Sequence, residues 1–591
     1  MKLAAGKIIQ RRPLISSADL PPGLHPVLHR IYRARQVTSA QELEQSLERL
    51  VPPARLGGTN EAARVLAEAI ERQRRLLIVA DFDADGATSC ALAVRALRSL
   101  GAREVQYLVP NRFEYGYGLT PEIVALAAQR QPDLIITVDN GISSVAGVEE
   151  ARRRGIDVLV TDHHLPGATL PPASVIVNPN QPGDDFPSKY LAGVGVIFYV
   201  MLALRAHLRE TGWFTRQNVA EPNLARLLDL VALGTVADVV PLDHNNRVLV
   251  GQGLRRINQG AACAGINALL RAAGRAPERA TAMDLGYVVG PRLNAAGRLT
   301  DMSLGIECLL TDDPIAAQNM AQELDALNHE RRGIEARMQQ QALAAVEHLR
   351  LDQATLPRGL CLYDESWHQG VIGLVASRIK ERAHRPVIAF APAGGDEIKG
   401  SARSVPGLHI RDALDAIAAQ HPQLLSKFGG HAMAAGLTLR RADLETFRQA
   451  FDTEVSRHLS EDDLLGKILS DGELGADELT LPLAELLRNA GPWGQGFPEP
   501  LFDGCFEVLS QRVVGEKHLK MALRVPGQTK AVDAIAFNSV HEARIPTYAR
   551  IRAVYRLDVN EYQGSRSLQL IVEYFEQAEA GREVVRPATA E

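Results

Sequence analysis

The sequence predicts an α/β protein with a parallel-sheet domain, a long connecting helix, a smaller second α/β domain and a C-terminal small β-barrel. Three observations support this. Aliphatic runs alternate with helical stretches over residues 76–161, a second alternating block starts at residue 359, and strand-like runs dominate the C-terminal part. A chain of 591 residues exceeds the size at which a single hydrophobic core stops growing, so several domains are expected.

The first block contains short aliphatic runs that we expect to form strands. Between them lie helical stretches, of which one ends at Gly101, one spans residues 121–129 and one ends near Gly155. The runs are apolar almost throughout, as strands covered on both faces should be. We therefore expect a mostly parallel sheet, with strands at residues 76–80, 105–109, 134–138 and 157–161.

A long helix is expected from Pro314 to about residue 350, because Asp313 can cap its first turn and proline suits that position. The second α/β block begins at Gly359 with a strand, and continues with a helix at 370–382 and a strand at 386–392. Five further runs indicate a small antiparallel barrel, which we interpret as an OB-fold: 506–514, 518–525, 532–537, 550–559 and 567–575.

These elements predict the limits of the domains along the chain. They are an N-terminal extension (1–70), the parallel-sheet domain (71–313), the connecting helix (314–355), the second α/β domain (356–460), the barrel (461–577) and a disordered tail (578–591).

The composition excludes several classes of protein. A net charge of -5 and a pI near 6.4 do not indicate a polyanion partner, so any contact with nucleic acid must be local. The five cysteines form no C-x-x-C pair, which argues against a disulfide framework and favours a reducing cytoplasm. The apolar run at 190–204 is shorter than the roughly 20 residues that span a bilayer, so we expect a buried helix and no membrane contact.

The strongest chemical feature is the run DFDADG, residues 81–86, directly after the first predicted strand. Three carboxylates at alternate positions can all stay ionised only beside a cation. Their hard oxygen ligands favour Mg²⁺ or Mn²⁺. An EF-hand loop would need Glu where this chain has Leu92, and helices on both sides. A solvated acidic loop is the remaining alternative for this run taken alone.

Further potential ligands follow other strands of the first block. Asp139 comes directly after the strand at 134–138, and Asp162, His163 and His164 follow the strand at 157–161. Because ligand sites gather at the carboxyl edge of a parallel sheet, we expect these groups to converge there. Asp238, in the apolar segment GTVADVVPL, would by itself be interpreted as a helix-terminal residue. The other potential ligands in the same chain favour the interpretation of Asp238 as a metal ligand.

The segments DFDADG, VDNG, TDHH and GTVADVVPL resemble the four motifs of the DHH phosphoesterase superfamily, in the spelling of its RecJ branch. The likeness extends to NRFEYGYGL, NPNQ, LAGVGV, GPRLNAAGR, WHQGVIG, KGSARS and FGGHAMAAG, and so covers nearly the whole chain. Many relatives begin the first motif with His where this chain has Asp81. The resemblance implies a DHH catalytic domain, a DHH-associated (DHHA1-like) domain and an OB-like nucleic-acid-binding domain.

The resemblance also implies two ions, Mg²⁺ or Mn²⁺, about 4 Å apart. One ion would be held by Asp81, Asp83 and Asp139, and the other by Asp85, Asp139, His163 and Asp238. The implied catalytic residues are Asp83, Asp139, His163 and His164. For His164, two roles stay open, either donation to a phosphoryl oxygen or orientation of the neighbouring carboxylates.

Candidate contacts to DNA or its phosphates lie elsewhere in the chain. Glycine-rich runs with polar side chains, and arginines near the motifs, suggest Arg112, Arg292, Arg298, Ser401, Arg403 and His431. On the predicted barrel, the candidates are Lys517, His518, Lys520 and Arg524. Ordinary surface positions remain the alternative for each of these residues.

The implied function is a single-stranded-DNA-specific 5′ to 3′ exonuclease of recombinational repair and mismatch repair. The implied partners are single-stranded DNA, single-strand-binding protein and a RecQ-type helicase. A DHH enzyme for pyrophosphate, very short RNA or cyclic dinucleotides is one rival, although it would need little beyond the two α/β domains. A non-catalytic strand-binding scaffold is another, although every expected acid and His is present. The chain contains no phosphate-binding P-loop, nucleophile elbow or H-E-x-x-H pair.

Overall fold

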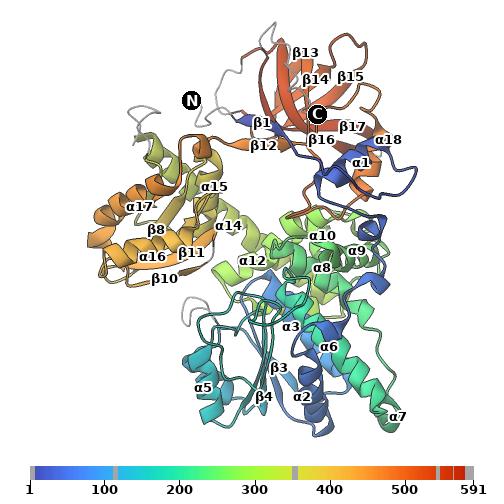
Figure 1. Cartoon of the computed structure of the whole chain (residues 1–591), viewed down its shortest axis with the longest axis vertical. Helices are drawn as coiled ribbons and strands as arrows, with labels where there is room; N and C mark the ends of the chain where they lie inside the picture. The colour runs from blue at the N-terminus through green and yellow to red at the C-terminus, as the bar shows by residue number, and fades with distance from the viewer. Residues whose placement is uncertain are drawn as a thin grey trace. The chain divides into compact units, whose positions relative to one another are not determined.

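The computed structural model describes residues 7–110, 118–348, 357–430, 432–540, 546–562 and 565–578. The chain forms two compact units, whose elements are labelled in Figure 1. The first comprises residues 40–334 with residues 492–498, and the second comprises residues 1–39, 335–491 and 499–591. The predicted domain limits differ from this division at both ends of the chain, and they stay predictions.

The first unit contains the predicted parallel sheet, in the order β3-β2-β4-β5-β6. Every neighbouring pair is parallel. The strands are β2 (Leu76–Ala80), β3 (Val105–Leu108), β4 (Leu134–Val138), β5 (Asp157–Thr161) and β6 (Val175–Val177). All residues of β2 and β4 are buried, which explains their unbroken apolar runs. The four predicted strands are confirmed, and the short β6 was not predicted.

Helices cover both faces of this sheet. On one face, α4 (Pro121–Ala128) and α5 (Val145–Arg153) share a buried cluster with β2, β4 and β5. On the other, α3 (Ala84–Leu100) contacts β2, while α6 (Gly193–Glu210) contacts β4 and β5 and packs against α2 (Thr59–Glu71). Gly101 ends α3 with a φ of 109°, a conformation that glycine adopts without a steric penalty.

Helices make up the rest of this unit. They are α7 (Trp213–Gln217), α8 (Leu228–Ala237), α9 (His244–Asn258), α10 (Ala264–Ala272), α11 (Ala282–Asp284), a π-helical turn at Leu285–Val289, α12 (Gly290–Leu299) and α13 (Ser303–Leu310). The long helix α14 (Pro314–His348) begins where predicted, because Asp313 accepts a hydrogen bond from the Ile315 amide at 2.9 Å.

The second unit contains a five-stranded mixed sheet and a closed barrel. The sheet order is β10-β11-β9-β8-β7, with β7 (Leu360–Tyr363), β8 (Val387–Gly394), β9 (Glu397–Arg403), β10 (Lys427–Gly430) and β11 (Ala434–Arg440). Its helices are α15 (Ile372–Ala383), α16 (Ile410–Gln420) and α17 (Leu444–His458). The barrel order is β13-β14-β15-β17-β16, with β13 (Phe502–Val514), β14 (His518–Arg524), β15 (Ala531–Ala536), β16 (Arg550–Tyr562) and β17 (Ser565–Gln577).

The N-terminal segment belongs to this second unit because β1 (Ile8–Arg11) pairs in parallel with β12 (Lys467–Ser470). The predicted fold class is confirmed, including the connecting helix and the C-terminal barrel. A search of the helices over the described residues finds none that is both long enough and apolar enough to cross a bilayer.

Candidate metal centre

Three acidic residues of the predicted motifs lie at the carboxyl edge of the parallel sheet because each sits one residue beyond a strand. Asp81 follows β2, Asp139 follows β4 and Asp162 follows β5. Their backbone amides extend the strand pairing, since Asp139 donates to the Thr161 carbonyl at 3.1 Å and Asp162 donates to the Val177 carbonyl at 3.1 Å. Neighbouring parallel strands thus place the acidic residues that follow them side by side.

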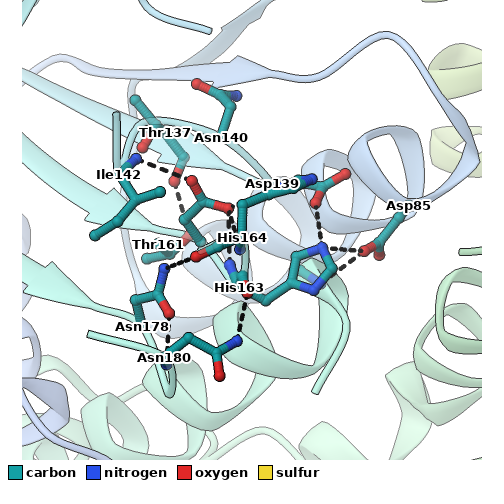
Figure 2. A network of polar contacts seen from close by, with 12 residues as sticks. Asp85, Thr137, Asp139, Asn140, Ile142, Thr161, His163, His164, Asn178 and Asn180 are labelled. Atoms are coloured by element: carbon teal, nitrogen blue, oxygen red, sulfur yellow. Dashed lines mark hydrogen bonds and ion pairs between the residues drawn. The ribbon is translucent and has the colours of Figure 1, made fainter. Parts of the chain in front are cut away.

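His163 is the centre of a dense cluster of carboxylates, part of which is seen in Figure 2. Its Nε2 lies 3.1 Å from Asp139 Oδ1, 3.5 Å from Asp238 Oδ2 and 3.9 Å from Asp85 Oδ2. Potential ligand atoms lie within 4.8 Å of one another in three overlapping groups: Asp81, Asp83 and Asp139; Asp85, His163 and Asp238; and Asp139, His163 and His164. The structure therefore brings together all six residues that were predicted as ligands.

The acidic loop after β2 is shaped by the start of α3. Asp83 caps this helix, because its Oδ1 accepts the Gly86 amide at 3.0 Å. A Cβ at position 86 would collide with the Asp81 carbonyl, so glycine lets the loop fold back on itself. Asp85 is directed by the N-terminus of α6, where Gly193 and Val194 donate their amides to its two oxygens at 2.6 and 2.9 Å.

Asp139 is held in a conformation that few residue types adopt. Its φ is 62°, in the left-handed region that Asp and Asn tolerate better than most residues. Gly193 packs directly against it, because a Cβ there would lie 2.6 Å from Asp139 Cβ. Such backbone conformations cost of order 1–3 kcal/mol and persist where the surroundings enforce them. The glycine at the start of α6 therefore makes room for the central carboxylate.

Asp162 orients the two histidines and is not itself in any of the three groups. Its carboxylate accepts the amides of Ile142, His163 and His164 at 2.9, 2.7 and 3.1 Å, and lies 2.7 Å from His164 Nδ1. Burial alone would lower the pKa of His164, but the hydrogen bond to Asp162 and the nearby carboxylates raise it to about 9. At neutral pH this raised pKa favours the protonated His164 ring, whose Nδ1 faces Asp162.

Crowding of negative charge changes the acidity of the cluster. Burial, and then the charge of Asp83, raise the pKa of Asp85 to about 7. Burial, and then the charge of Asp85, raise the pKa values of Asp139 and Asp238 well above their usual range. Several buried carboxylates and one imidazole form a donor set that fits hard divalent cations, whose charge would offset the repulsion.

The predicted DNA contacts have different outcomes. Arg112 and His431 lie outside the described residues. Arg298 is half-buried in the last turn of α12. Arg292 is buried, pairs with Asp325 of α14 at 2.7 Å and donates to the Val288 carbonyl. These contacts favour a structural role for Arg292 over the predicted role in gripping a strand.

Ser401 and Arg403 lie together on β9 in the second unit. Arg403 Nη1 donates to Ser401 Oγ at 3.0 Å and to the Ala402 carbonyl at 2.8 Å. A Cβ at Gly373, in the first turn of α15, would lie 2.8 Å from Arg403 Nη2. Among the described residues, no carboxylate pairs with Arg403, so a partly buried cation beside a helix N-terminus forms a potential phosphate site.

The basic residues of the barrel are partly neutralised. Lys520 pairs with Asp533 at 3.2 Å, and Arg524 pairs with Glu507 at 2.8 Å. His518 Nδ1 accepts the Asn538 amide at 3.0 Å. Their predicted role in binding DNA stays a prediction, and the ion pairs reduce the positive charge that two of them offer.

Sequence reasoning missed several residues that shape the metal centre. Asn294 Oδ1 accepts the Ala84 amide at 2.8 Å and so holds the acidic loop from α12. Asn178 and Asn180 donate to the carbonyls of His164 and His163 at 2.9 and 2.6 Å. These asparagines and Gly193 lie in the segments NPNQ, LAGVGV and GPRLNAAGR, which carried the family likeness, but the residues themselves had been given no role.

Comparison with known proteins adds independent findings. The sequence matches the DHH family N-terminal domain over residues 75–235, the DHHA1 domain over 356–457 and the RecJ OB domain over 470–574. It is 57% identical to the single-stranded-DNA-specific exonuclease RecJ of Dickeya dadantii, over 96% of this chain and 98% of that protein.

Solved structures give a corresponding result. The crystal structure of Thermus thermophilus RecJ in complex with Mn²⁺ has a TM-score of 0.77 and 30% identity, covering 97% of this chain and 80% of that one. Its complex with Mg²⁺ has a TM-score of 0.72 and 28% identity, covering 97% and 79%. Those relatives bind the two cations that the donor set at the sheet edge would accept.

Proposed function

Because this chain belongs to the RecJ family of single-stranded-DNA-specific exonucleases, we propose that it hydrolyses single-stranded DNA from the 5′ end with two divalent cations. The observation that carries the proposal is the cluster around His163, where Asp85, Asp139 and Asp238 all lie within 3.9 Å of one imidazole nitrogen. So many buried acids around one imidazole are costly to maintain in their charged form without a cation.

The two cations would share Asp139. Asp81, Asp83 and Asp139 would hold one of them, while Asp85, Asp139, His163 and Asp238 would hold the other. Bound there, the ions supply Lewis acidity to the scissile phosphodiester and to the attacking water. Mg²⁺ and Mn²⁺ both suit this mixture of carboxylate and imidazole ligands.

The protein's own groups position and protonate the reactants. The amides of Gly193 and Val194 fix both oxygens of Asp85, so this carboxylate is oriented before substrate binds. Asp162 holds the His164 ring through Nδ1, which directs the remaining N–H away from that carboxylate. His164, as a cation, would donate to a phosphoryl oxygen as negative charge develops there in the transition state. The contact between His164 and Asp162 also fits the alternative role, in which His164 orients a neighbouring carboxylate.

Ser401 and Arg403 would bind a phosphate of the strand. The Arg403 side chain is partly buried, and its hydrogen bonds run to a hydroxyl and a backbone carbonyl, so an anion would gain a strong charge-assisted contact. A terminal 5′ phosphate carries more charge than an internal one, and binding it there would favour one end of the strand.

The resemblance suggests finer aspects that stay predictions. They are the 5′ to 3′ direction, roles in recombinational repair and mismatch repair, contacts with single-strand-binding protein and a RecQ-type helicase, and a cytoplasmic location. The rival that cleaves small substrates is disfavoured, because this chain adds a closed barrel to the two α/β domains. A non-catalytic scaffold is disfavoured by the complete ligand set.

The test is degradation of oligonucleotides labelled at either end, single- or double-stranded, with Mn²⁺ or with chelator. We expect metal-dependent loss of single strands from the 5′ end, and a loss of activity beyond about 100-fold in Asp139→Ala, more than removal of an outer-shell partner costs. Asp229→Asn is the matched control, because Asp229 is equally buried and accepts the Cys263 amide in the same unit. Persistent activity in chelator, or in folded Asp139→Ala, would refute the proposal.

A further inference from the structure

A short segment far along the chain belongs to the unit that contains the metal centre. Residues 492–498, here called the hook, group with residues 40–334, while the residues on either side of the hook group with the second unit. The hook is internally closed. Gly494 and Phe497 exchange backbone hydrogen bonds at 2.9 and 3.2 Å, and the rings of Trp493 and Phe497 stack 5.2 Å apart.

The hook packs against the turn that follows Asp238. The Leu242 amide donates to the Gln495 carbonyl at 2.7 Å. A Cβ at Gly494 would lie 2.7 Å from Leu242 Cδ1, so the hook backbone rests directly on this side chain. A Cβ at Gly496 would likewise lie 3.1 Å from Pro241 Cβ, so the backbone of Gly496 also lies close to the turn.

Arg247 of α9 joins the hook and the turn from a third side. Its guanidinium lies over the Phe497 ring, 4.3 Å from the centroid, and its Nη1 donates to the Leu242 carbonyl at 3.0 Å. A cation above an aromatic face is attracted by the negative charge density of the ring, most strongly where water is excluded. Phe497 is therefore positioned to stabilise both the hook and the Arg247 contact to the turn.

The turn after Asp238 needs such support because the backbone of Val239, its first residue, is strained. Asp238 ends α8, and Val239 next to it has a φ of 63° and is 63% exposed. A β-branched residue in the left-handed region is costly and offsets little of that cost when its side chain faces solvent. The downstream contacts to Pro241 and Leu242 must then enforce the conformation.

From this geometry we infer that the hook is a positioning element for Asp238, and so for one of the two cations. The inference rests on the proposed function. The hook contacts the turn after Asp238, whereas Asp81, Asp83 and Asp139 are set by strand ends and the cap of α3. Loosening the hook should weaken the cation held by Asp85, His163 and Asp238 and leave the other unchanged.

The test is direct titration of the full-length protein with Mn²⁺, followed by electron paramagnetic resonance of the free ion. Wild type should bind two ions. Phe497→Ala should weaken one of them by about 10-fold or more, the range seen when a ligand's supporting contacts are removed. Phe451→Ala is the matched control, because Phe451 is buried and stacks on Phe447 in the second unit. That control should leave both affinities unchanged.

A double-mutant cycle separates positioning from general loosening. If the hook acts through Asp238, adding Phe497→Ala to Asp238→Asn should cost little further affinity, whereas its effect should add to that of Asp81→Asn. Should Phe497→Ala fail to fold, Gly496→Ala replaces it. Gly496 has a φ of 72°, and a Cβ there would lie 3.1 Å from Pro241, so this substitution strains the contact with the turn but keeps the aromatic ring. Unchanged affinities in a folded hook variant, or equal weakening of both ions, would overturn the inference. A wild type that binds no Mn²⁺ would instead sink the proposed function.

Discussion

The metal centre and the barrel differ in how their acidic side chains are surrounded. At the sheet edge, Asp85, Asp139 and Asp238 crowd around the imidazole of His163. On the barrel, Glu507 pairs with both Arg524 and Arg550, and Arg556 pairs with Glu573. Buried acids that crowd together indicate a site for a cation, whereas acids that pair with arginine indicate a structural role.

The largest expected effect comes from neutralising one acid in each region. Asp85→Asn should lower nuclease activity more than about 100-fold, since it removes a carboxylate that would bind a cation directly. Glu507→Gln, on the barrel, should change activity by no more than about twofold, because exposed ion pairs contribute little. Initial rates on a labelled single strand at saturating Mn²⁺ measure both. Equal losses in the two variants would break the contrast between the regions.

The contrast also explains how far sequence reasoning reached. The strands and the convergence of Asp81 and Asp139 could be predicted, because apolar runs mark buried parallel strands and such strands end at one edge. The contact of Asn294 with the acidic loop, and that of Gln495 with Leu242, could not. They join residues far apart in sequence through backbone groups, and no local periodicity reports such pairs.

Arg292 shows the other limit of the sequence. An arginine in a family motif suggests a contact to phosphate. The sequence does not show whether a carboxylate of the protein already forms an ion pair with that arginine. Asp325 comes from the following long helix and pairs with the guanidinium at 2.7 Å. Ser401 and Arg403, in contrast, adjoin each other in sequence and on one strand, so their proximity could be anticipated.

The second prediction concerns how the crowded acids of the metal centre make the stability of the metal-free protein depend on pH. Burial and then Asp83 raise the pKa of Asp85 to about 7, above its unfolded value near 4. Such a group stabilises the metal-free fold fully below about pH 4, and this contribution is lost as the pH rises through about 7. Metal-free wild type should therefore lose thermal stability relative to Asp85→Asn between about pH 4 and 7.

Mn²⁺ should reverse this trend, because it replaces protons at the same oxygens. The rise in Tm on adding Mn²⁺ should be larger at pH 8 than at pH 5.5 for wild type, and small at both for Asp85→Asn. Calorimetric melts with chelator or Mn²⁺ measure these differences. A stability difference between the two proteins that does not vary with pH would contradict the assignment of the proton to this cluster.

The third prediction tests the isolated cation of the second unit. Arg403→Ala should raise the Kd for a 5′-phosphorylated oligonucleotide about 10-fold, in line with the roughly 1.5–3 kcal/mol of a hydrogen bond to a charged group. Binding of the same oligonucleotide with a 5′ hydroxyl should change less. Arg378→Ala is the matched control, because that arginine pairs with Glu335 at 3.2 Å in the same unit. Equal weakening for both oligonucleotides would assign Arg403 to internal phosphates.

The smallest expected effect belongs to the compensated charges of the barrel. Lys520 and Asp533 form a partly exposed pair at 3.2 Å, so Lys520→Ala should change the free energy of unfolding by no more than about 1 kcal/mol. A lysine that contacts a phosphate of single-stranded DNA adds about 0.7 to the slope of log affinity against log salt. Because Asp533 already neutralises Lys520, its removal should reduce that slope by clearly less than this amount. Fluorescence titrations over a range of salt, with Lys517→Ala for comparison, measure the slope. If Lys520→Ala reduced the slope by the full value of about 0.7 for one phosphate contact, DNA would have to displace Asp533 from Lys520. The paired charges of this barrel would then form a binding surface.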